Sequence, residues 1–163
     1  MDIKEIETDL SNKLSKKRFI HTLGVVNSAM YLAKKYGANI EDAHLAALLH
    51  DCAKEIPLLE MHDLVADLPC DQDMLHSGAL LHGLAGMVLA NTQYGVTNPD
   101  ILEAIRVHTT GKENMSKLDK IIFLADYIEP NRKFPGVNDI RLAAEQSLDA
   151  GVLRSEEHTS ELQ

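Results

Sequence analysis

The sequence predicts an all-α protein, a bundle of about eight helices around a central metal site. Three observations support this prediction. Signals for β-strands are nearly absent, apolar residues recur at helical steps of three and four positions, and several His and Asp residues sit in or beside apolar segments. A length of 163 residues suits one domain. The chain is 45% apolar, with no Trp, four Tyr and three Phe, so Ala, Leu and Ile are expected to fill the interior.

The first half of the chain is expected to form four helices. Apolar positions at three- and four-residue steps predict the first, and Gly37 is expected to end the second. The run AHLAALLHD is almost wholly apolar, which favours a central place for the third helix. Pro57 supports a new start after it. The expected helices run over about Ile3–Leu14, Lys17–Tyr36, Ile40–Ala53 and Leu58–Val65.

The second half begins with an expected loop over residues 66–77, which contains Pro69 and three Asp. Asn98 can cap a helix that has Pro99 at its first position, and Ser116 can cap the next one. A further loop is expected over Glu129–Gly136. The expected helices run over about Leu81–Tyr94, Pro99 to near His108, Lys117–Ile128, and onward from Val137.

The last ten residues, RSEEHTSELQ, differ from what precedes them. They are polar and lack the helical apolar period seen from Val137 to Leu153. They also look like the translation of a common sequencing-adapter oligonucleotide. We therefore expect one domain over residues 1–153, truncated at its C-terminal end, and a non-native tail over residues 154–163. His158 lies in this tail and is excluded as a ligand.

Composition and charge exclude several classes of function. A formal net charge of −9 argues against a nucleic-acid partner, which needs a basic footprint, although a metal and a few local cations can still attract a nucleotide. No apolar run reaches the ~20 residues that cross a bilayer, and the acidic, amphipathic start is unlike a secretory signal. Cys52 and Cys70 form no CxxC pair and fit free thiols in a reducing compartment. We expect a soluble cytoplasmic protein.

A set of His and Asp residues is the main functional signal. Neutral imidazole and carboxylate are ligands that transition metals prefer. His50 and Asp51 are adjacent, so both side chains can reach one ion only where the helix ends or the ion lies beside its axis. Asp126 lies in the apolar run IIFLADYIEP, where a buried carboxylate is costly unless it is paired or bound to metal. The expected metal ligands are His21, His50, Asp51 and Asp126.

His82 and His108 extend this set to six residues. Six ligands exceed one tetrahedral zinc site. They fit either one metal with outer histidines or a two-metal centre of the kind used on phosphate esters, and the residues leave both open. An isolated His on an apolar helix is usually structural, and we interpret the remaining histidines of the domain in this way: His44, His62 and His76.

At these residues the chain resembles the HD superfamily of metal-dependent phosphohydrolases, and within it the YqeK family of symmetrical bis(5′-nucleosyl)-tetraphosphatases. The resemblance covers essentially all of residues 1–153. The stretch ADYIEPNR-x-FPGV is much more specific than the His-Asp pair. The matching segments are RFIHTLGVVNSA (Arg18–Ala29), AALLHDCAKEIP (Ala46–Pro57), LLHGLAG (Leu80–Gly86), and Ala104–Val137 with the helix after it.

The resemblance implies an HD-domain helical bundle that hydrolyses diadenosine tetraphosphate to two ADP. It implies one or two metal ions, with iron expected and manganese, zinc or nickel also suitable. Members of the family continue beyond residue 153, so a final segment that packs near the nucleotide is expected to be missing. A homodimer is a further expectation.

The resemblance also assigns roles to individual residues. The four expected ligands would hold the core metal, and Asp51 would be catalytic. His82 and His108 would be catalytic, by giving a proton to the leaving ADP, or would hold a second ion or the substrate phosphates. The residues that would line the phosphate region are Arg18, Lys54, Thr109 and Arg132.

Several alternatives stay open at this point. Arg18, Lys54 and Arg132 also fit ordinary solvated surface charges. The sequence shows no Ser-His-Asp catalytic triad pattern, no glycine-rich phosphate-binding loop and no surroundings typical of a reactive cysteine. Cys52 is interpreted as a buried side chain that fills space in the core. The competing functions are another HD-type phosphohydrolase of nucleoside mono- or triphosphates, and a non-catalytic nucleotide-binding module pinned by its metal.

Overall fold

The computed structural model describes residues 1–161, and these form ten helices and no β-strand, which confirms the all-α prediction. Two of the ten helices were not expected, the four-residue α5 and the separate α10. The helices are α1 (Ile3–Lys13), α2 (Lys16–Tyr36), α3 (Ile40–Leu49), α4 (Leu58–Val65), α5 (Gln72–Leu75), α6 (Gly78–Thr92), α7 (Pro99–Arg106), α8 (Lys117–Ile128), α9 (Val137–Gln146) and α10 (Leu148–Glu161).

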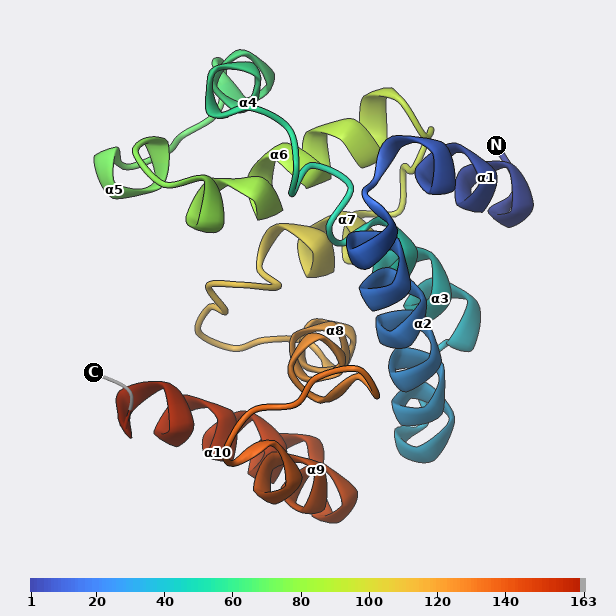
Figure 1. Cartoon of the computed structure of the whole chain (residues 1–163), viewed down its shortest axis with the longest axis vertical. Coiled ribbons are helices and arrows are strands. Elements are labelled where there is room, and N and C mark those ends of the chain that lie inside the picture. Colours follow the sequence, from blue (N-terminus) through green and yellow to red (C-terminus); the bar gives the residue numbers. More distant parts are fainter. Residues whose placement is uncertain (162–163) are drawn as a thin grey trace.

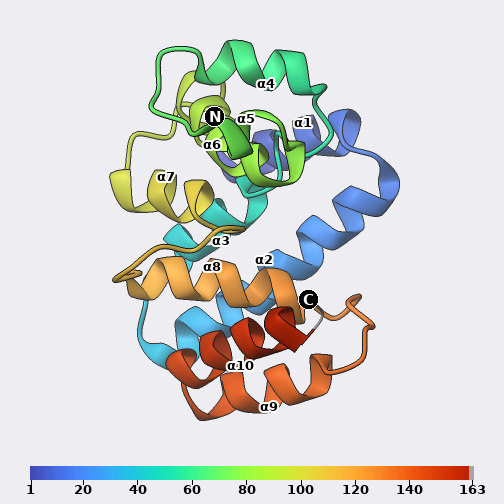
Figure 2. The same cartoon turned by 90° about the vertical axis from the view of Figure 1, so that its left-hand side faces the viewer.

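The helices gather at two ends of an elongated molecule. Helices α1, α4, α5 and α6 lie at one end and α9 and α10 at the other, with α3, α7 and α8 between them (Figures 1 and 2). Helix α8 contacts α2, α3, α7, α9 and α10, and α7 connects it to α6. The ends of α3, α7 and α8 therefore meet near the middle of the fold.

The interior consists of two hydrophobic clusters. The larger one draws residues from α1, α2, α3, α7, α8, α9 and α10 and from the end of α6, and the smaller one joins α4 and α6. Ala46 and Ala47 of α3 are fully buried, as the apolar run predicts, and their small side chains permit close approach of neighbouring helices. Larger side chains such as Leu48 and Ile121 are also buried, and each contributes about 1.5–3 kcal/mol relative to exposure.

Three predicted helix ends are confirmed, two by a capping side chain and one by a glycine. Asn98 accepts a hydrogen bond from the Asp100 amide and Pro99 opens α7. Ser116 and Asp119 form a reciprocal capping box at α8. Gly37 ends α2 in the left-handed conformation, with φ 73°.

The third helix is shorter than predicted. It ends at Leu49 instead of Ala53, and the chain continues through tighter turns, with the His50 amide donating to Ala47 and the Cys52 amide to Leu49. These i→i−3 bonds turn His50 and Asp51 relative to each other more than a regular helix would.

The end of the chain also differs from the prediction. The backbone is extended at Ser147, with φ −165° and ψ 160°, and this divides the expected last helix into α9 and α10. The boundary suggested at residue 153 falls inside α10, which continues to Glu161 with Ser155 buried. The last two residues of the suggested tail lie outside the described residues. Its non-native origin stays a proposal.

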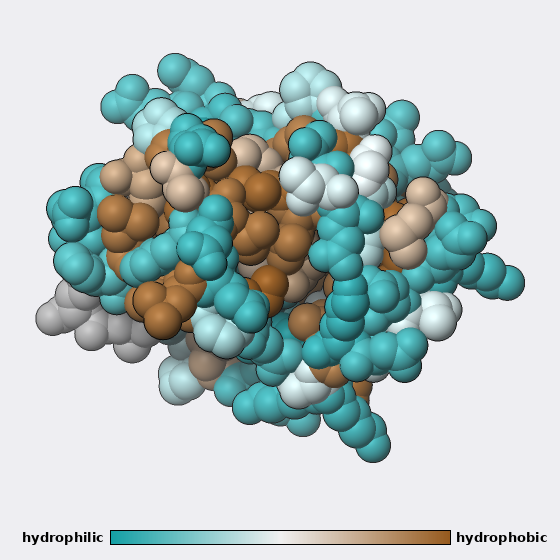
Figure 3. All heavy atoms as spheres, turned by 90° about the horizontal axis from the view of Figure 1, so that it is seen from above, coloured by the Kyte–Doolittle hydropathy of each residue, from teal (hydrophilic) through white to brown (hydrophobic). Residues whose placement is uncertain are grey.

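The surface at the α1–α4–α6 end is partly apolar. Figure 3 looks down on it, and hydrophobic residues gather in the middle of the face with hydrophilic ones around them. A cavity of about 580 Å³ lies on this side, with Leu14, Ile56, Leu64 and Tyr94 in its wall. Among the residues that the structure describes, no helix combines the length and the apolar character needed to cross a membrane.

Candidate functional site

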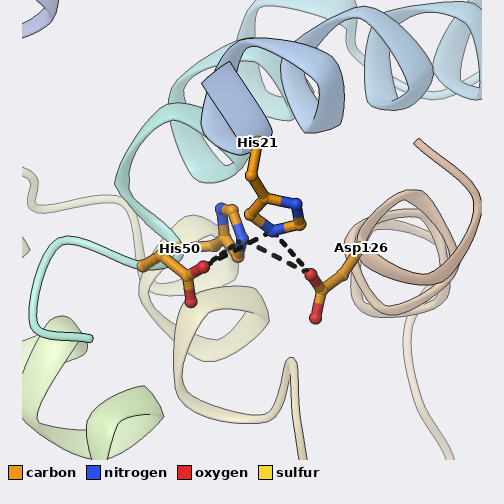
Figure 4. Close-up of side chains that lie close together, drawn as sticks. His21, His50 and Asp126 are labelled. Carbon is orange, nitrogen blue, oxygen red and sulfur yellow. Dashed lines mark ion pairs between the residues drawn. The ribbon is translucent and has the colours of Figure 1, made fainter. Parts of the chain in front are cut away.

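The four expected metal ligands converge from three elements of the fold. Figure 4 shows His21 reaching from α2, His50 from the turn after α3 and Asp126 from α8 toward a common point. Asp51 completes the group. One ligand atom from each of the four residues lies within 4.8 Å of all the others. This spacing is close to what bonds of about 2.0–2.2 Å to one ion require.

The carboxylate oxygens interleave with the imidazole nitrogens in this group. Asp51 Oδ2 lies 3.2 Å from His50 Nε2 and 3.5 Å from His21 Nε2. Asp126 Oδ1 lies 3.0 Å from His21 Nε2 and 3.7 Å from His50 Nε2. Both nitrogens are buried, and neither makes a well-directed hydrogen bond. A buried polar atom without a hydrogen-bond partner is energetically costly. The arrangement of these two nitrogens therefore fits a site in which a bound ligand, and not another protein atom, is their partner.

Asp51 also belongs to a second group, with His82 and His108. Its Oδ1 lies 3.1 Å from His82 Nε2 and 3.3 Å from His108 Nε2, and these two nitrogens are 3.0 Å apart. Two imidazole nitrogens at this distance require a proton or a cation between them. The carboxylate of Asp51 therefore bridges two groups of histidines.

Each of the four imidazoles is oriented by an acceptor on its other nitrogen. A proton on Nδ1 that is donated outward leaves the lone pair of Nε2 facing the centre, as a metal ligand requires. The contacts are His21 Nδ1 to Glu129 Oε2 at 2.7 Å, His50 Nδ1 to the Ala47 carbonyl at 2.6 Å, His82 Nδ1 to the Gly78 carbonyl at 3.1 Å and His108 Nδ1 to the Ile105 carbonyl at 2.7 Å.

Charge in the centre is balanced by protons when no cation is present. Burial disfavours a charged imidazole at His50, but Asp51 and Asp126 outweigh it and raise the pKa of His50 to about 10. Burial likewise opposes the charge on His21, and the carboxylates of Asp126 and Asp51 still raise its pKa. Against the opposing effect of burial, the neighbouring histidines hold the pKa values of Asp51 and Asp126 well below the usual range. The donor set thus attracts positive charge strongly.

We predict that metal uptake releases protons. Coordination needs the Nε2 lone pair, and the raised pKa of His50 means that this nitrogen is protonated at pH 7.5 in the metal-free protein. About one proton or more should leave per ion bound in the first group, so metal affinity should rise with pH up to about 10. Calorimetric titration in buffers of different ionisation enthalpy measures the number. A binding enthalpy that does not change with the buffer would contradict the prediction.

Glu129 is a buried part of the site that the sequence reasoning did not single out. Its Oε2 accepts from His21, its Oε1 accepts from the Asn131 amide at 2.6 Å, and the residue is 1% exposed. A carboxylate on the far nitrogen of a ligating histidine fixes the ring and raises its basicity. The signal that could have found it is a Glu three positions after Asp126, on the same face at the end of an apolar helix.

Gly24 makes room for this carboxylate, which gives a second prediction. A Cβ at this position would collide with Glu129 Oε1 and lie 3.0 Å from Glu129 Cδ. Gly24→Ala should displace Glu129 from His21 and weaken metal binding about 10- to 100-fold, as the loss of an outer partner does. Gly78→Ala is the control, because a Cβ there meets no atom nearer than 3.9 Å. Equal metal affinity in both variants would refute the role given to Glu129.

Two cavities open beside the centre and share one arginine. One of about 480 Å³ is lined by His21, Arg18, Arg132 and, nearby, Lys16 and Lys17. The two lysines were also missed by the sequence reasoning. Three basic residues in the first turn of α2 are electrostatically unfavourable, because the helix dipole places partial positive charge at that end. Such an unfavourable arrangement is the sequence feature that could have indicated a functional role.

The second cavity, of about 260 Å³, includes His108, Thr109, Asp126 and Arg132 in its wall. The hydroxyl of Thr109 is buried and makes no hydrogen bond, so its polar atom is free to meet a ligand. Tyr127 contributes an aromatic wall on this side. Both cavities thus reach the group of expected metal ligands, one at His21 and the other at Asp126.

The other expected substrate residues are placed unequally. Arg18 Nη1 lies 2.9 Å from Asp51 Oδ2, and Arg132 Nη2 lies 3.1 Å from Asp126 Oδ1, so each arginine also pairs with a carboxylate of the centre. Lys54 lies in the turn after Asp51, partly buried, and its ammonium group makes no ion pair within residues 1–161. The geometry supports the two arginines more directly than the lysine.

The remaining histidines and the neighbouring cysteine lie outside the two ligand groups. His62 Nε2 contacts the Leu75 carbonyl at 2.5 Å and so connects α4 to α5. His158 stacks on Phe134 with a centroid distance of 5.0 Å. Cys52 is buried, and burial raises the pKa of its thiol to about 12, which suits a filler and not a nucleophile.

Comparison with known proteins identifies a family and several named relatives. The HD-domain family model matches residues 18–131. The chain is 47% identical over 143 residues to the symmetrical bis(5′-nucleosyl)-tetraphosphatase of Halalkalibacterium halodurans, covering 87% of this chain and 76% of the relative. It is 41% identical over 160 residues to the protein of that name from Bacillus subtilis, covering 98% and 86%.

A solved structure extends the likeness to three dimensions. The crystal structure of a protein from Clostridium acetobutylicum, described as a predicted HD superfamily hydrolase involved in NAD metabolism, matches with a TM-score of 0.96 and 40% identity. The match covers 99% of this chain and 87% of that one.

The fold and the His/Asp centre define an HD-domain protein, a class whose hydrolases bind divalent metals. The chain belongs to the HD-domain family and, within it, to the branch that contains the symmetrical bis(5′-nucleosyl)-tetraphosphatases.

Proposed function

We propose that this protein is a metal-dependent hydrolase that splits diadenosine tetraphosphate, and related dinucleoside tetraphosphates, into two nucleoside diphosphates. One observation carries the proposal: a compact His/Asp group of the kind that holds a metal opens onto a cavity lined by Lys16, Lys17, Arg18 and Arg132. The curated relatives at 39–47% identity carry the name of this activity.

The charge of the site fits a polyphosphate. The chain has a formal net charge of −9, yet four cationic side chains gather at this one cavity. Arg18 and Arg132 can each present paired N–H donors to phosphate oxygens, and Lys16 and Lys17 can act as point charges. The carboxylate of Glu129, the acidic residue in this cavity wall, is occupied by His21 and the Asn131 amide. A long anionic chain can therefore approach the centre.

The residues present fit a bound metal, with His21, His50, Asp51 and Asp126 as its ligands. When bound, the ion lowers the pKa of a water molecule and withdraws charge from the phosphoryl oxygens. Iron is the metal that we expect, and manganese, zinc or nickel also suit imidazole and carboxylate ligands. His82 and His108, with the bridging Asp51, fit a second ion or the phosphates of the substrate.

The protein's own groups then handle phosphate and proton. Arg18 and Arg132 orient the tetraphosphate so that a central phosphorus faces the centre. A P–O bond to the water oxygen would form there while the water loses a proton to solvent, the bridging P–O bond would break, and the departing ADP would take up a proton. His82 or His108 can deliver that proton when no cation occupies their group, since both Nε2 atoms face the site.

Product analysis tests the proposal. Metal-stripped protein is reloaded separately with Fe²⁺, Mn²⁺, Zn²⁺ and Ni²⁺, and incubated with diadenosine tetraphosphate, with NAD⁺ and with ATP. Two ADP as the only products support the proposal. AMP with ATP would indicate attack at an outer phosphate, and cleavage of ATP or NAD⁺ in preference would favour another HD-type phosphohydrolase. Tight nucleotide binding without turnover would favour a non-catalytic module.

The expected setting is the cytoplasm, with free nucleotides as partners and neither nucleic acid nor membrane. Two unpaired cysteines, Cys52 and Cys70, and the overall negative charge support this setting. A homodimer stays a prediction, which light scattering of the purified protein tests.

A further inference from the structure

Arg141 lies on α9, outside the metal-binding groups, and its guanidinium contacts three main-chain carbonyls of one loop. Nε donates to the Ile128 carbonyl at 3.1 Å, and Nη2 donates to the carbonyls of Glu129 and Arg132, each at 3.0 Å. The planar fork of one side chain therefore ties the end of α8 to the segment that follows it.

The segment held in this way carries two residues of the centre. Glu129 orients His21 through a 2.7 Å contact with its Nδ1. Arg132 donates to Asp126 twice, from Nε to the carbonyl at 3.0 Å and from Nη2 to Oδ1 at 3.1 Å. Each of these contacts meets a different expected ligand, one on α2 and one on α8. A shift of the segment would move both.

We propose that Arg141 is a positioning residue for the metal centre, acting through Glu129 on His21 and through Arg132 on Asp126. This inference rests on the proposed function in so far as the centre binds a metal. A lysine cannot replace the arginine, because a single ammonium group cannot span three carbonyls that lie along a turn.

A simpler role would be to cap α8. The carbonyls of Ile128 and Glu129 end that helix, and basic side chains often satisfy such carbonyls. The contact with the Arg132 carbonyl goes beyond a cap, because that residue lies in the loop, four positions past the end of the helix at Ile128. The two roles differ in what they change: a cap supports folding alone, whereas a positioning residue also sets the affinity of the folded centre for metal.

Three variants of the full chain separate the roles. Arg141→Met keeps the apolar stem and removes all the donors, and Arg141→Lys keeps the charge. Asn138→Ala is the matched control, because Asn138 accepts from Arg141 Nη1 at 3.2 Å but belongs to α9 itself and is none of the three residues whose carbonyls Arg141 holds. We measure the Kd for Co²⁺, the visible absorption of bound Co²⁺, and the melting temperature without metal.

We expect Arg141→Met and Arg141→Lys to bind Co²⁺ about 10- to 100-fold more weakly than the unmodified protein at temperatures where all are folded. Their Co²⁺ absorption bands should shift, and Asn138→Ala should match the unmodified protein in both readouts. A lower melting temperature with an unchanged Kd and spectrum would mean that Arg141 only caps α8, and this result would overturn the proposal. Should Arg141→Met fail to fold, Arg141→Lys carries the same test.

A double-variant cycle with Glu129→Gln tests the route of the effect. If Arg141 acts through Glu129, the combined variant should lose less Co²⁺ affinity than the two single losses together. Fully additive losses would overturn that route. An unmodified protein that binds no Co²⁺, Fe²⁺ or Mn²⁺ would refute the proposed function itself, and this outcome is distinct from equal binding by all variants, which refutes only the role of Arg141.

Discussion

Asp51→Ala is expected to abolish turnover of diadenosine tetraphosphate and to release the metal. The carboxylate of Asp51 contacts His21 and His50 through Oδ2, and His82 and His108 through Oδ1. No other residue in the described part of the chain belongs to both ligand groups. Loss of an outer partner typically costs 10- to 100-fold in metal affinity, so loss of this shared ligand should cost more than about 100-fold. Elemental analysis after dialysis, with product chromatography, measures both effects.

Two controls accompany this variant. Asp67→Ala removes an exposed aspartate in the connection after α4, and His62→Ala removes a histidine that contacts the Leu75 carbonyl. Both should keep full metal content and turnover. If Asp51→Ala retained metal and activity like these controls, the assignment of the centre would be wrong.

Gly83→Ala is expected to damage the second group selectively. A Cβ at Gly83 would lie 2.6 Å from the Arg106 carbonyl oxygen and 3.3 Å from that of Ile105. Both atoms belong to backbone and cannot rotate away. The Ile105 carbonyl also holds His108 Nδ1, so separation of α6 from the end of α7 should pull His82 and His108 apart. Such overpacking costs about 1–3 kcal/mol of unfolding free energy.

Gly78→Ala is the matched control on the same helix, because its Cβ would make only an ordinary contact, with the Met61 side chain at 3.9 Å. Denaturant unfolding and metal counting should show a less stable Gly83→Ala protein that keeps the ion of the first group and loses any ion of the second. Unchanged stability, or loss of both ions together, would contradict the close packing of α6 on α7 as the support of this group.

Much of the fold follows from patterns local to the chain. Apolar spacing predicts the helices because each must bury one face, and Asn98, Ser116 and Gly37 mark helix ends through their own side chain or backbone freedom. The four ligand residues stand out because buried His and Asp in apolar helices need a partner. The structure brings these four together within 4.8 Å of one another, and their role as ligands stays a proposal.

The remaining features depend on contacts between distant segments. The role of Glu129 depends on its contact with His21, which lies 108 positions earlier in the chain. Arg141 resembles any surface arginine until the loop before it folds against α9. The early end of α3 after Leu49 has no adjacent glycine or proline to mark it, and the turn that follows brings the side chains of His50 and Asp51 to one centre. Periodicity alone carries no information about such pairings.

Anomalous diffraction tests the central claim most directly. The protein is purified and crystallised with its metal, and diffraction is measured above and below the iron absorption edge. We expect an anomalous peak for an iron ion that is coordinated by Nε2 of His21 and His50 and by the carboxylates of Asp51 and Asp126. A manganese, zinc or nickel peak at the same place, found at its own edge, would change the metal and keep the site. A metal bound elsewhere in an active protein, with these four side chains free of it, would contradict the account.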